Sequence, residues 1–94
     1  MQHCILIIDD EARVLTLLNE VFEGGGYRVL TAADWSEAKV CLEVEEVDLV
    51  TLDLHLGTEN GLVVARRIRQ RSGVPIIMIT GSDDVFDRVV GLEL

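Results

Sequence analysis

The chain has 94 residues, which suits one domain, and 49 % of them are hydrophobic while only 4 % are aromatic. A packed core is therefore feasible and must be built from Val, Leu and Ile, as in a parallel sheet covered by helices. The net charge of −9 argues against a nucleic-acid-binding surface, which requires clustered Lys and Arg. An acidic balance fits a module that binds a cation, or an ordinary soluble domain.

Short aliphatic runs alternate along the chain with segments whose apolar residues recur at helical spacing. In chain order we expect a strand at 3–9, a helix at 14–22, a strand at 27–31, a helix from 34, a strand at 47–54, a helix from 60 or 61, a strand at 74–80 and a last helix from 82 or 83 through Val85, Val89 and Leu92. Glycines 24–26 and Gly73 end the first and third helices, and Asp34 with Glu37 is a capping-box pattern. This order predicts one α/β domain over residues 1–94, a doubly wound parallel sheet with right-handed crossovers.

Several residues are assigned structural roles. Cys4 and Cys41, the two cysteines, lie among apolar positions, which predicts buried free thiols rather than a disulfide. Residues 1–8 have no basic region and are too short to span a membrane, so we expect a reduced, cytoplasmic protein. The arginines between 66 and 71 are interpreted as a solvated helix face because the chain is acidic, and Trp35 is interpreted as a packing residue.

Polar side chains lie at the carboxyl ends of three predicted strands. Asp9 and Asp10 end the first strand, and Asp53 lies near the end of the third. Thr80 ends the fourth strand and is followed by Gly81, which leaves space and a backbone N–H. Because ligands of doubly wound sheets bind beyond this edge, we expect these side chains to converge there.

The chemistry of this group depends on its carboxylates. Asp10 alone could instead cap the first helix. Asp53 needs more explanation, because a carboxylate that closes an aliphatic strand is unfavourable unless something compensates it. Clustered carboxylates raise one another's pKa unless a divalent cation lies between them, and hard oxygen ligands suit Mg²⁺. The pattern thus predicts a magnesium site, where an aspartate can attack phosphorus and form an aspartyl phosphate, with Thr80 as a hydroxyl donor.

Four stretches, ILIIDDE, DLVTLDLHLG, ENGL and VPIIMITG, occur in the order and at the spacing of the receiver (CheY-like) domain family. The whole chain resembles this family, and VPIIMITGSDDVFDRVVGLEL further resembles the OmpR/PhoB-type subfamily, whose members carry a C-terminal winged-helix DNA-binding domain. The resemblance implies a flavodoxin-like sheet with strand order 2-1-3-4. It also implies a switch rather than a metabolic enzyme, one that takes a phosphoryl group from a sensor histidine kinase and controls transcription.

The resemblance assigns roles to individual residues. Asp53 matches the phosphoacceptor, Asp10 the direct magnesium ligand, and Asp9 the acidic partner that reaches the metal through water. The backbone carbonyl of His55 matches the third protein ligand, and Thr80 matches the switch hydroxyl that closes on the phosphoryl group. The His55 side chain occupies a position that tunes phosphoryl lifetime in the family, although a lone His there is by default an exposed loop residue.

The chain departs from the family in two places. Gly57 stands four residues after the acceptor, where the family often has Pro. The family also continues with a fifth strand that carries a functional Lys and a switch aromatic, and then with a fifth helix. This chain ends at Leu94, and its only lysine is Lys39 on the predicted second helix. We therefore expect a receiver truncated before its fifth strand, without the DNA-binding domain of its parent.

Two other functions fit parts of the pattern. A haloacid-dehalogenase-type phosphatase also uses an Asp nucleophile, but it needs a second Asp two residues later, where this chain has His55, and a cap domain for which there is no room. A degenerate receiver, which is an interaction module that is not phosphorylated, is favoured by the missing Lys. The intact acidic residues and Thr80 argue against it.

The missing fifth strand and helix also predict an assembly. Strand 75–80 would be left as an aliphatic edge with unpaired backbone groups. One face of the sheet would be uncovered near Ile5, Ile7, Leu49 and Leu52, or their alternates. We therefore expect a homo-oligomer that forms its contacts mainly through residues 75–94, and no membrane partner.

Overall fold

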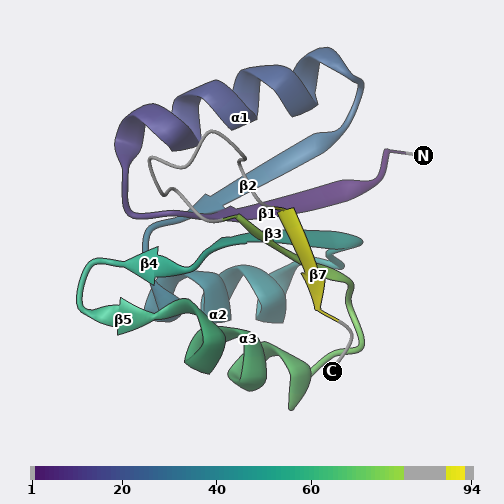
Figure 1. Cartoon of the computed structure of the whole chain (residues 1–94). Helices are drawn as coiled ribbons and strands as arrows, with labels where there is room; N and C mark the ends of the chain where they lie inside the picture. Colours follow the sequence, from purple (N-terminus) through teal and green to yellow (C-terminus); the bar gives the residue numbers. More distant parts are fainter. Residues whose placement is uncertain (1, 80–88, 93–94) are drawn as a thin grey trace.

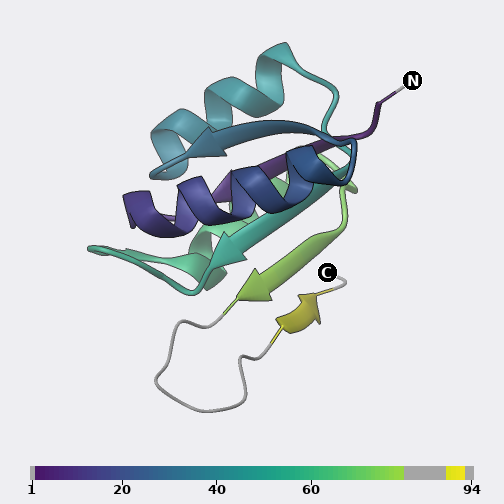
Figure 2. The ribbon, with the colours of Figure 1, turned by 90° about the horizontal axis from the view of Figure 1, so that it is seen from above.

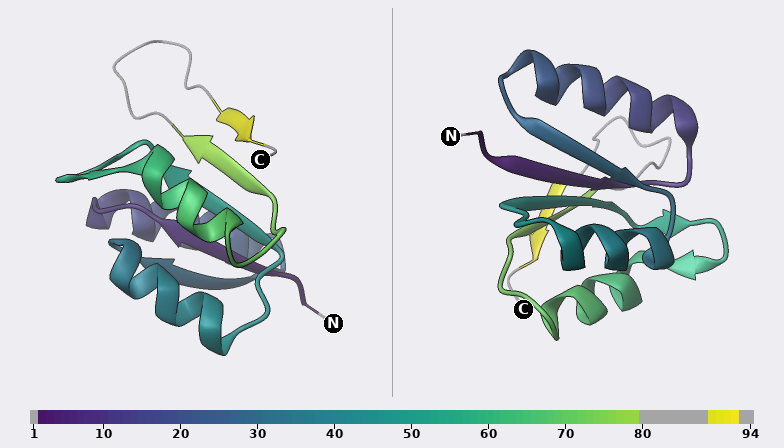
Figure 3. Two further views of the ribbon diagram at one scale, coloured as in Figure 1. Left: turned by 90° about the horizontal axis from the view of Figure 1, so that it is seen from below. Right: turned by 180° about the vertical axis from the view of Figure 1, so that it is seen from behind.

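A computed structural model describes residues 2–79 and 89–92 of the chain (Figure 1). In chain order the elements are β1 (Cys4–Ile8), α1 (Ala12–Gly24), β2 (Arg28–Ala32), α2 (Trp35–Val44), β3 (Leu49–Asp53), β4 (His55–Leu56), β5 (Glu59–Asn60), α3 (Gly61–Arg69), β6 (Ile76–Ile79) and β7 (Val89–Leu92). Helix α1 covers one face of the main sheet, and α2 and α3 lie side by side on the other face (Figures 1 and 3).

The main sheet has the strand order β2-β1-β3-β6-β7 among the described residues. Strand β1 pairs in parallel with β2 and β3, and β3 pairs in parallel with β6. Each parallel connection contains one helix, as crossovers in such sheets require. The expected doubly wound α/β fold and the 2-1-3-4 order of its parallel strands are therefore confirmed.

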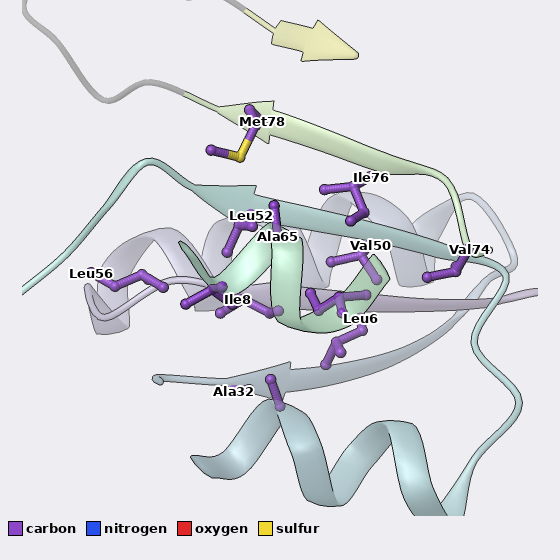
Figure 4. Close-up of a cluster of buried hydrophobic side chains, with 13 residues drawn as sticks. Leu6, Ile8, Ala32, Val50, Leu52, Leu56, Ala65, Val74, Ile76 and Met78 are labelled. Carbon is purple, nitrogen blue, oxygen red and sulfur yellow. The ribbon is translucent and has the colours of Figure 1, made fainter. Parts of the chain in front are cut away.

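The face of the sheet under α2 and α3, called here the α2/α3 face, holds the hydrophobic core (Figure 4). Its strand residues alternate with period two, and α3 buries Val64, Ala65 and Ile68 on one side while its arginines lie elsewhere. Leu6, Leu52 and Ile68 in this core have no exposed surface. The strand and helix members of the core include Leu6, Ile8, Val50, Leu52, Ile76, Met78, Ala38, Val64, Ala65 and Ile68.

The opposite face, called here the α1 face, is less completely covered. By alternation its strand residues are Ile5, Ile7, Leu49, Thr51, Asp53, Ile77 and Ile79. Helix α1 has no buried residue, and Leu17 and Val21 on it are 60 % and 58 % exposed. The expectation of an uncovered face is nevertheless wrong at Ile5 and Ile7, which are 3 % and 0 % exposed.

The end of the described chain corrects two expectations. Val89–Leu92 forms strand β7, which pairs antiparallel with β6, where the sequence favours a helix (Figure 2). The edge of β6 is therefore paired, and the expectation of an open edge there is wrong. The physical reason is that a β-branched segment of the same chain can satisfy the backbone groups of β6. Assembly through residues 75–94 stays a prediction, and residues 80–88 and 93–94 lie outside the described part.

Three local features complete the comparison with the sequence. Helix α3 ends at Arg69, four residues before Gly73, where the sequence places its end. The loop before α3 contains a small hairpin of β4 and β5 that the sequence analysis does not predict. Cys4 and Cys41 are free thiols, as expected, and Cys4 is buried, but Cys41 is only half-buried.

Trp35 packs against the edge of the core, in agreement with its interpretation as a packing residue. Within residues 2–79 and 89–92, no helix has the length and hydrophobicity that crossing a bilayer requires.

Candidate metal centre

Three carboxylates meet at the carboxyl edge of the sheet. Strand β1 ends at Ile8 and is followed by Asp9 and Asp10, while Asp53 is the last residue of β3. Since β1 and β3 are parallel neighbours and Ile8 lies opposite Leu52, Asp9 and Asp53 come to the same point. One carboxylate oxygen from each of Asp9, Asp10 and Asp53 lies within 4.8 Å of the other two.

Asp9 is the buried member of this cluster, with 6 % of its surface exposed. Its Oδ1 accepts a hydrogen bond of 2.9 Å from the backbone N–H of Glu11. Burial raises the pKa of Asp9 to about 6, the carboxylates of Asp53 and Asp10 act in the same direction, and the Glu11 N–H opposes them. The folded chain therefore holds a carboxylate where its charge is unfavourable.

Asp10 lies at the surface beside Asp9. The alternative that Asp10 caps the first helix is not realised, because the residue in the N-cap position of α1 is Glu11, whose side chain forms no cap hydrogen bond. Asp10 is thus left without a structural role at the start of α1. Its position in the cluster is the better explanation for a carboxylate at this site.

Asp53 is half-buried at the end of β3. Its Oδ1 accepts a hydrogen bond of 3.2 Å from the backbone N–H of His55, so this oxygen is fixed by the following turn. Burial raises the pKa of Asp53 above its ordinary value, the His55 N–H opposes this, and the Asp10 carboxylate adds to it. Asp53 is therefore an oriented carboxylate in a site that disfavours its charge.

The β4–β5 hairpin lies directly against the cluster. His55 pairs with Asn60 and Leu56 with Glu59, with Gly57 and Thr58 between them. Gly57 has a φ of 60°, and a Cβ there would lie 3.3 Å from Oδ2 of Asp10. A Gly with positive φ at the first position of a two-residue loop is typical of hairpin turns, which is the signal that could have predicted this hairpin. The side chain of His55 is exposed, as expected for a lone histidine in a loop.

Gly61 is a site residue that the sequence analysis does not single out. It is the first residue of α3, and its N–H donates a hydrogen bond of 2.8 Å to the carbonyl of Leu54. A Cβ at Gly61 would lie 2.4 Å from the carbonyl oxygen of Asp53 and 2.8 Å from Cα of Leu54. Only glycine allows the helix to begin this close to the backbone of Asp53.

These residues fit a magnesium ion. The cluster offers hard carboxylate oxygens from one buried, one half-buried and one exposed residue, which leaves room for water on the open side. Burial and, to a smaller extent, repulsion between the carboxylates raise the pKa of Asp9 and Asp53, and a divalent cation would offset both effects. Thr80, the expected switch hydroxyl, lies outside the described residues.

Comparisons with known proteins agree on one family. The family model described as the response regulator receiver domain matches residues 5–94. The alkaline phosphatase synthesis transcriptional regulatory protein PhoP of Bacillus subtilis is 43 % identical over 95 residues, which cover 100 % of this chain and 40 % of that protein. The chain thus spans about 40 % of the length of this curated relative.

Two solved response regulator structures are similar in fold, and each contains a divalent cation. The response regulator protein TrrA from Thermotoga maritima, in complex with Mg²⁺–BeF, is 34 % identical with a TM-score of 0.79, over 87 % of this chain and 72 % of that chain. A response regulator protein from Burkholderia pseudomallei, with a phosphorylated aspartic acid, calcium ion and citrate, is 28 % identical with a TM-score of 0.81, over 89 % of this chain and 50 % of that chain.

Proposed function

This chain belongs to the response regulator receiver domain family, and from that membership we propose that it is the phosphoacceptor module of a two-component response regulator. In this proposal Asp53 takes a phosphoryl group from a sensor histidine kinase with the help of Mg²⁺. The observation that carries it is the group of three carboxylates, Asp9, Asp10 and Asp53, within 4.8 Å of one another at the carboxyl edge of the sheet.

Four groups would hold the metal. Asp10 and Asp53 would be direct carboxylate ligands, Asp9 would act through water, and the backbone carbonyl of His55 would be the third protein ligand. The metal, when bound, neutralises the oxygens of the transferring phosphoryl group. The Burkholderia structure contains a calcium ion and the Thermotoga structure contains Mg²⁺, which supports a divalent cation as the ligand of this chain.

Asp53 would be the nucleophile. Its Oδ1 is held by the His55 N–H, so Oδ2 is the oxygen left to attack. A bond forms from Oδ2 to phosphorus while the bond from phosphorus to the imidazole nitrogen of a phosphohistidine breaks, and that nitrogen keeps the electron pair. The Thr80 hydroxyl would then close on the new phosphoryl group. The chain assists its own phosphorylation and dephosphorylation and is a switch rather than a metabolic enzyme.

The output would be transcription, in the cytoplasm. PhoP is a transcriptional regulatory protein, and this chain aligns with 40 % of it, so DNA binding would belong to a separate C-terminal domain. The chain itself has a net charge of −9, which does not favour DNA contact. The direct partners would be the kinase and, in the expected homo-oligomer, a second copy that contacts residues 75–94.

Labelling with a small phosphodonor tests the proposal. The chain is incubated with Mg²⁺ and acetyl phosphate, and the phosphorylated residue is mapped by mass spectrometry. We expect a base-labile phosphate on Asp53 alone, absent from Asp53→Asn. Labelling should be slow, because the only lysine, Lys39, lies on α2 and not at the carboxylate cluster. A phosphate mapped to any other residue would contradict the assignment.

A further inference from the structure

Glu59 links the hairpin beside the metal centre to a helix on the α2/α3 face. Its Oε1 accepts a partly buried hydrogen bond of 3.0 Å from the backbone N–H of Trp35, which is 24 residues away in the chain. Trp35 is the first residue of α2, so its N–H has no acceptor within the helix. A carboxylate at this end of a helix is also favoured by the helix dipole.

The hairpin has few other attachments. Strands β4 and β5 pair with each other and form a sheet separate from the main one (Figure 1). Leu56 enters the core and is 3 % exposed, which fixes one side of the hairpin. Asn60 accepts a hydrogen bond of 2.8 Å from the Leu62 N–H in α3, the helix that directly follows the hairpin. Among the described residues, the bond from Glu59 to Trp35 is the side-chain hydrogen bond that joins the hairpin to a helix distant in the chain.

Trp35 is a fixed point for this link. The guanidinium carbons of Arg67 and Arg71 on the α3 side lie 5.9 Å and 5.7 Å from the centre of the Trp35 ring. The ring also packs against the core. Glu59 therefore holds the hairpin to a residue that is itself held by two elements.

The hairpin brings two groups to the metal centre. A Cβ at Gly57 would lie 3.3 Å from Oδ2 of Asp10, so the hairpin passes close to this oxygen. His55 supplies both the N–H that orients Asp53 and the carbonyl proposed as a ligand. We propose that Glu59 is a positioning residue for the metal centre, which sets the place of His55 and Gly57 through its bond to Trp35. This inference rests on the proposed function, since it assumes that the carboxylate cluster binds Mg²⁺.

Magnesium titrations of the parent and three variants test the inference. Glu59→Leu removes the acceptor, Glu59→Gln keeps an acceptor but removes the charge, and Thr58→Ala is a control at an exposed position of the same hairpin. By calorimetry we expect Glu59→Leu to bind Mg²⁺ about tenfold more weakly than the parent, as is common when a group that orients a ligand is lost. Glu59→Gln and Thr58→Ala should stay within about twofold of the parent, because neither loses the hydrogen bond.

Trp35, the only tryptophan, gives a second signal that loss of stability alone would not change. We expect Mg²⁺ to alter its emission in the parent and in Glu59→Gln, and to alter it less in Glu59→Leu at saturating metal. If Glu59→Leu does not fold, amide exchange in the parent decides: Mg²⁺ should slow exchange of the Trp35 N–H.

The outcomes separate this inference from the proposed function. If the parent binds Mg²⁺, Asp10→Asn does not, and Glu59→Leu binds as tightly as the parent, the role of Glu59 is wrong and the metal site stands. Unchanged exchange at Trp35 on metal binding would likewise overturn it. If the parent does not bind Mg²⁺, or Asp10→Asn binds equally well, the proposed site itself fails.

Discussion

The two faces of the central sheet are built from neighbouring residues of the same strands, yet they differ in what they hold. On the α2/α3 face, Leu6, Leu52 and Ile68 have no exposed surface. On the α1 face, alternation places Asp53 and Thr51 among aliphatic residues, and α1 has no buried residue. Fully buried strand residues thus lie on both faces, but the helix that covers the α1 face contributes none, and the Asp53 carboxylate projects from that face.

This difference indicates a division of work within each strand. Even small shifts in the packing of a dense core are costly, so residues there serve stability. A carboxylate whose pKa is raised by burial costs stability when it is ionised, and such groups gather at functional sites. The comparison therefore predicts that substitutions on the two faces differ in size and even in sign, and the following experiments test this from the largest effect to the smallest.

Adjacent residues of β6 give the largest expected contrast. Ile76 faces the core and is 2 % exposed, whereas Ile77 lies on the α1 face and is only partly buried. We expect Ile76→Ala to lower the free energy of unfolding by about 3–4 kcal/mol and Ile77→Ala by about half of that. Urea unfolding at neutral pH measures both. Equal losses would show that the α1 face is as well packed as the other.

Asp9→Asn should stabilise the metal-free protein. With a pKa of about 6 in the folded chain against 3.8 ordinarily, Asp9 binds its proton more tightly when folded. Ionisation of Asp9 therefore lowers the free energy of unfolding. The full cost is present above pH 6, and it disappears as the pH falls from 6 towards 4. The gain from Asp9→Asn at pH 7.5 should reach at most about 3 kcal/mol. Unfolding curves recorded with a chelator measure it.

The control for Asp9→Asn is the same stability measurement made at low pH. At pH 4 the parent and the variant should have nearly the same stability, since the parent's carboxyl is then protonated when folded. The same variant should bind Mg²⁺ more weakly, which links the stability gain to the lost function. A variant that is less stable than the parent at pH 7.5 would contradict the assignment of Asp9 as an unfavourable charge.

Thr51→Val tests a buried hydroxyl on the α1 face that has no hydrogen-bond partner among the described residues. Thr51 is 3 % exposed, and its Oγ1 has no hydrogen-bond partner among the described residues. Val has almost the same shape, so we expect a gain of about 1 kcal/mol. Thermal unfolding gives the value, and Thr51→Ser, which keeps the hydroxyl, is the matched control. A loss of stability in Thr51→Val would mean that the hydroxyl does have a partner.

Leu17→Gln on α1 should have the smallest effect. Leu17 is 60 % exposed, and substitutions at such surface positions usually change stability by less than about 0.5 kcal/mol. Measurements at low and high protein concentration separate two cases. If the loss of stability in Leu17→Gln grows with protein concentration, a second copy of the chain covers Leu17 in solution. Helix α1 would then be less exposed in the oligomer than in the single chain described here.

The sequence predicts a structural element reliably only where the pattern of apolar residues is several residues long. Aliphatic runs of several residues identify the four parallel strands, and their carboxyl ends bring Asp9, Asp10 and Asp53 together. Strand β7 is missed because Val89 and Leu92 also fit a helical spacing, and only the pairing with β6 decides between them.

Shorter features leave little pattern to detect, and for the β4–β5 hairpin the one signal is the glycine at the first position of its two-residue loop, Gly57. Strands β4 and β5 have two residues each, too few for a period. The bond between Glu59 and Trp35 uses a backbone N–H, which every residue except proline carries, so nothing in the two residue types indicates it. The ligand role of the His55 carbonyl and the switch role of Thr80 follow from family resemblance alone, and both stay predictions.

The closeness of Gly61 to Asp53 has a mechanical consequence. Because a Cβ would lie 2.4 Å from the Asp53 carbonyl oxygen, the first turn of α3 and the end of β3 are in backbone contact without a compressible side chain between them. A push on the exposed side of α3, where Leu62 and Val63 are 41 % and 40 % exposed, is therefore transmitted to the backbone of Asp53 almost without slack. In engineering terms α3 is a rigid lever on Asp53, the proposed acceptor, and we expect a binder raised against its outer side to act on this residue from a distance.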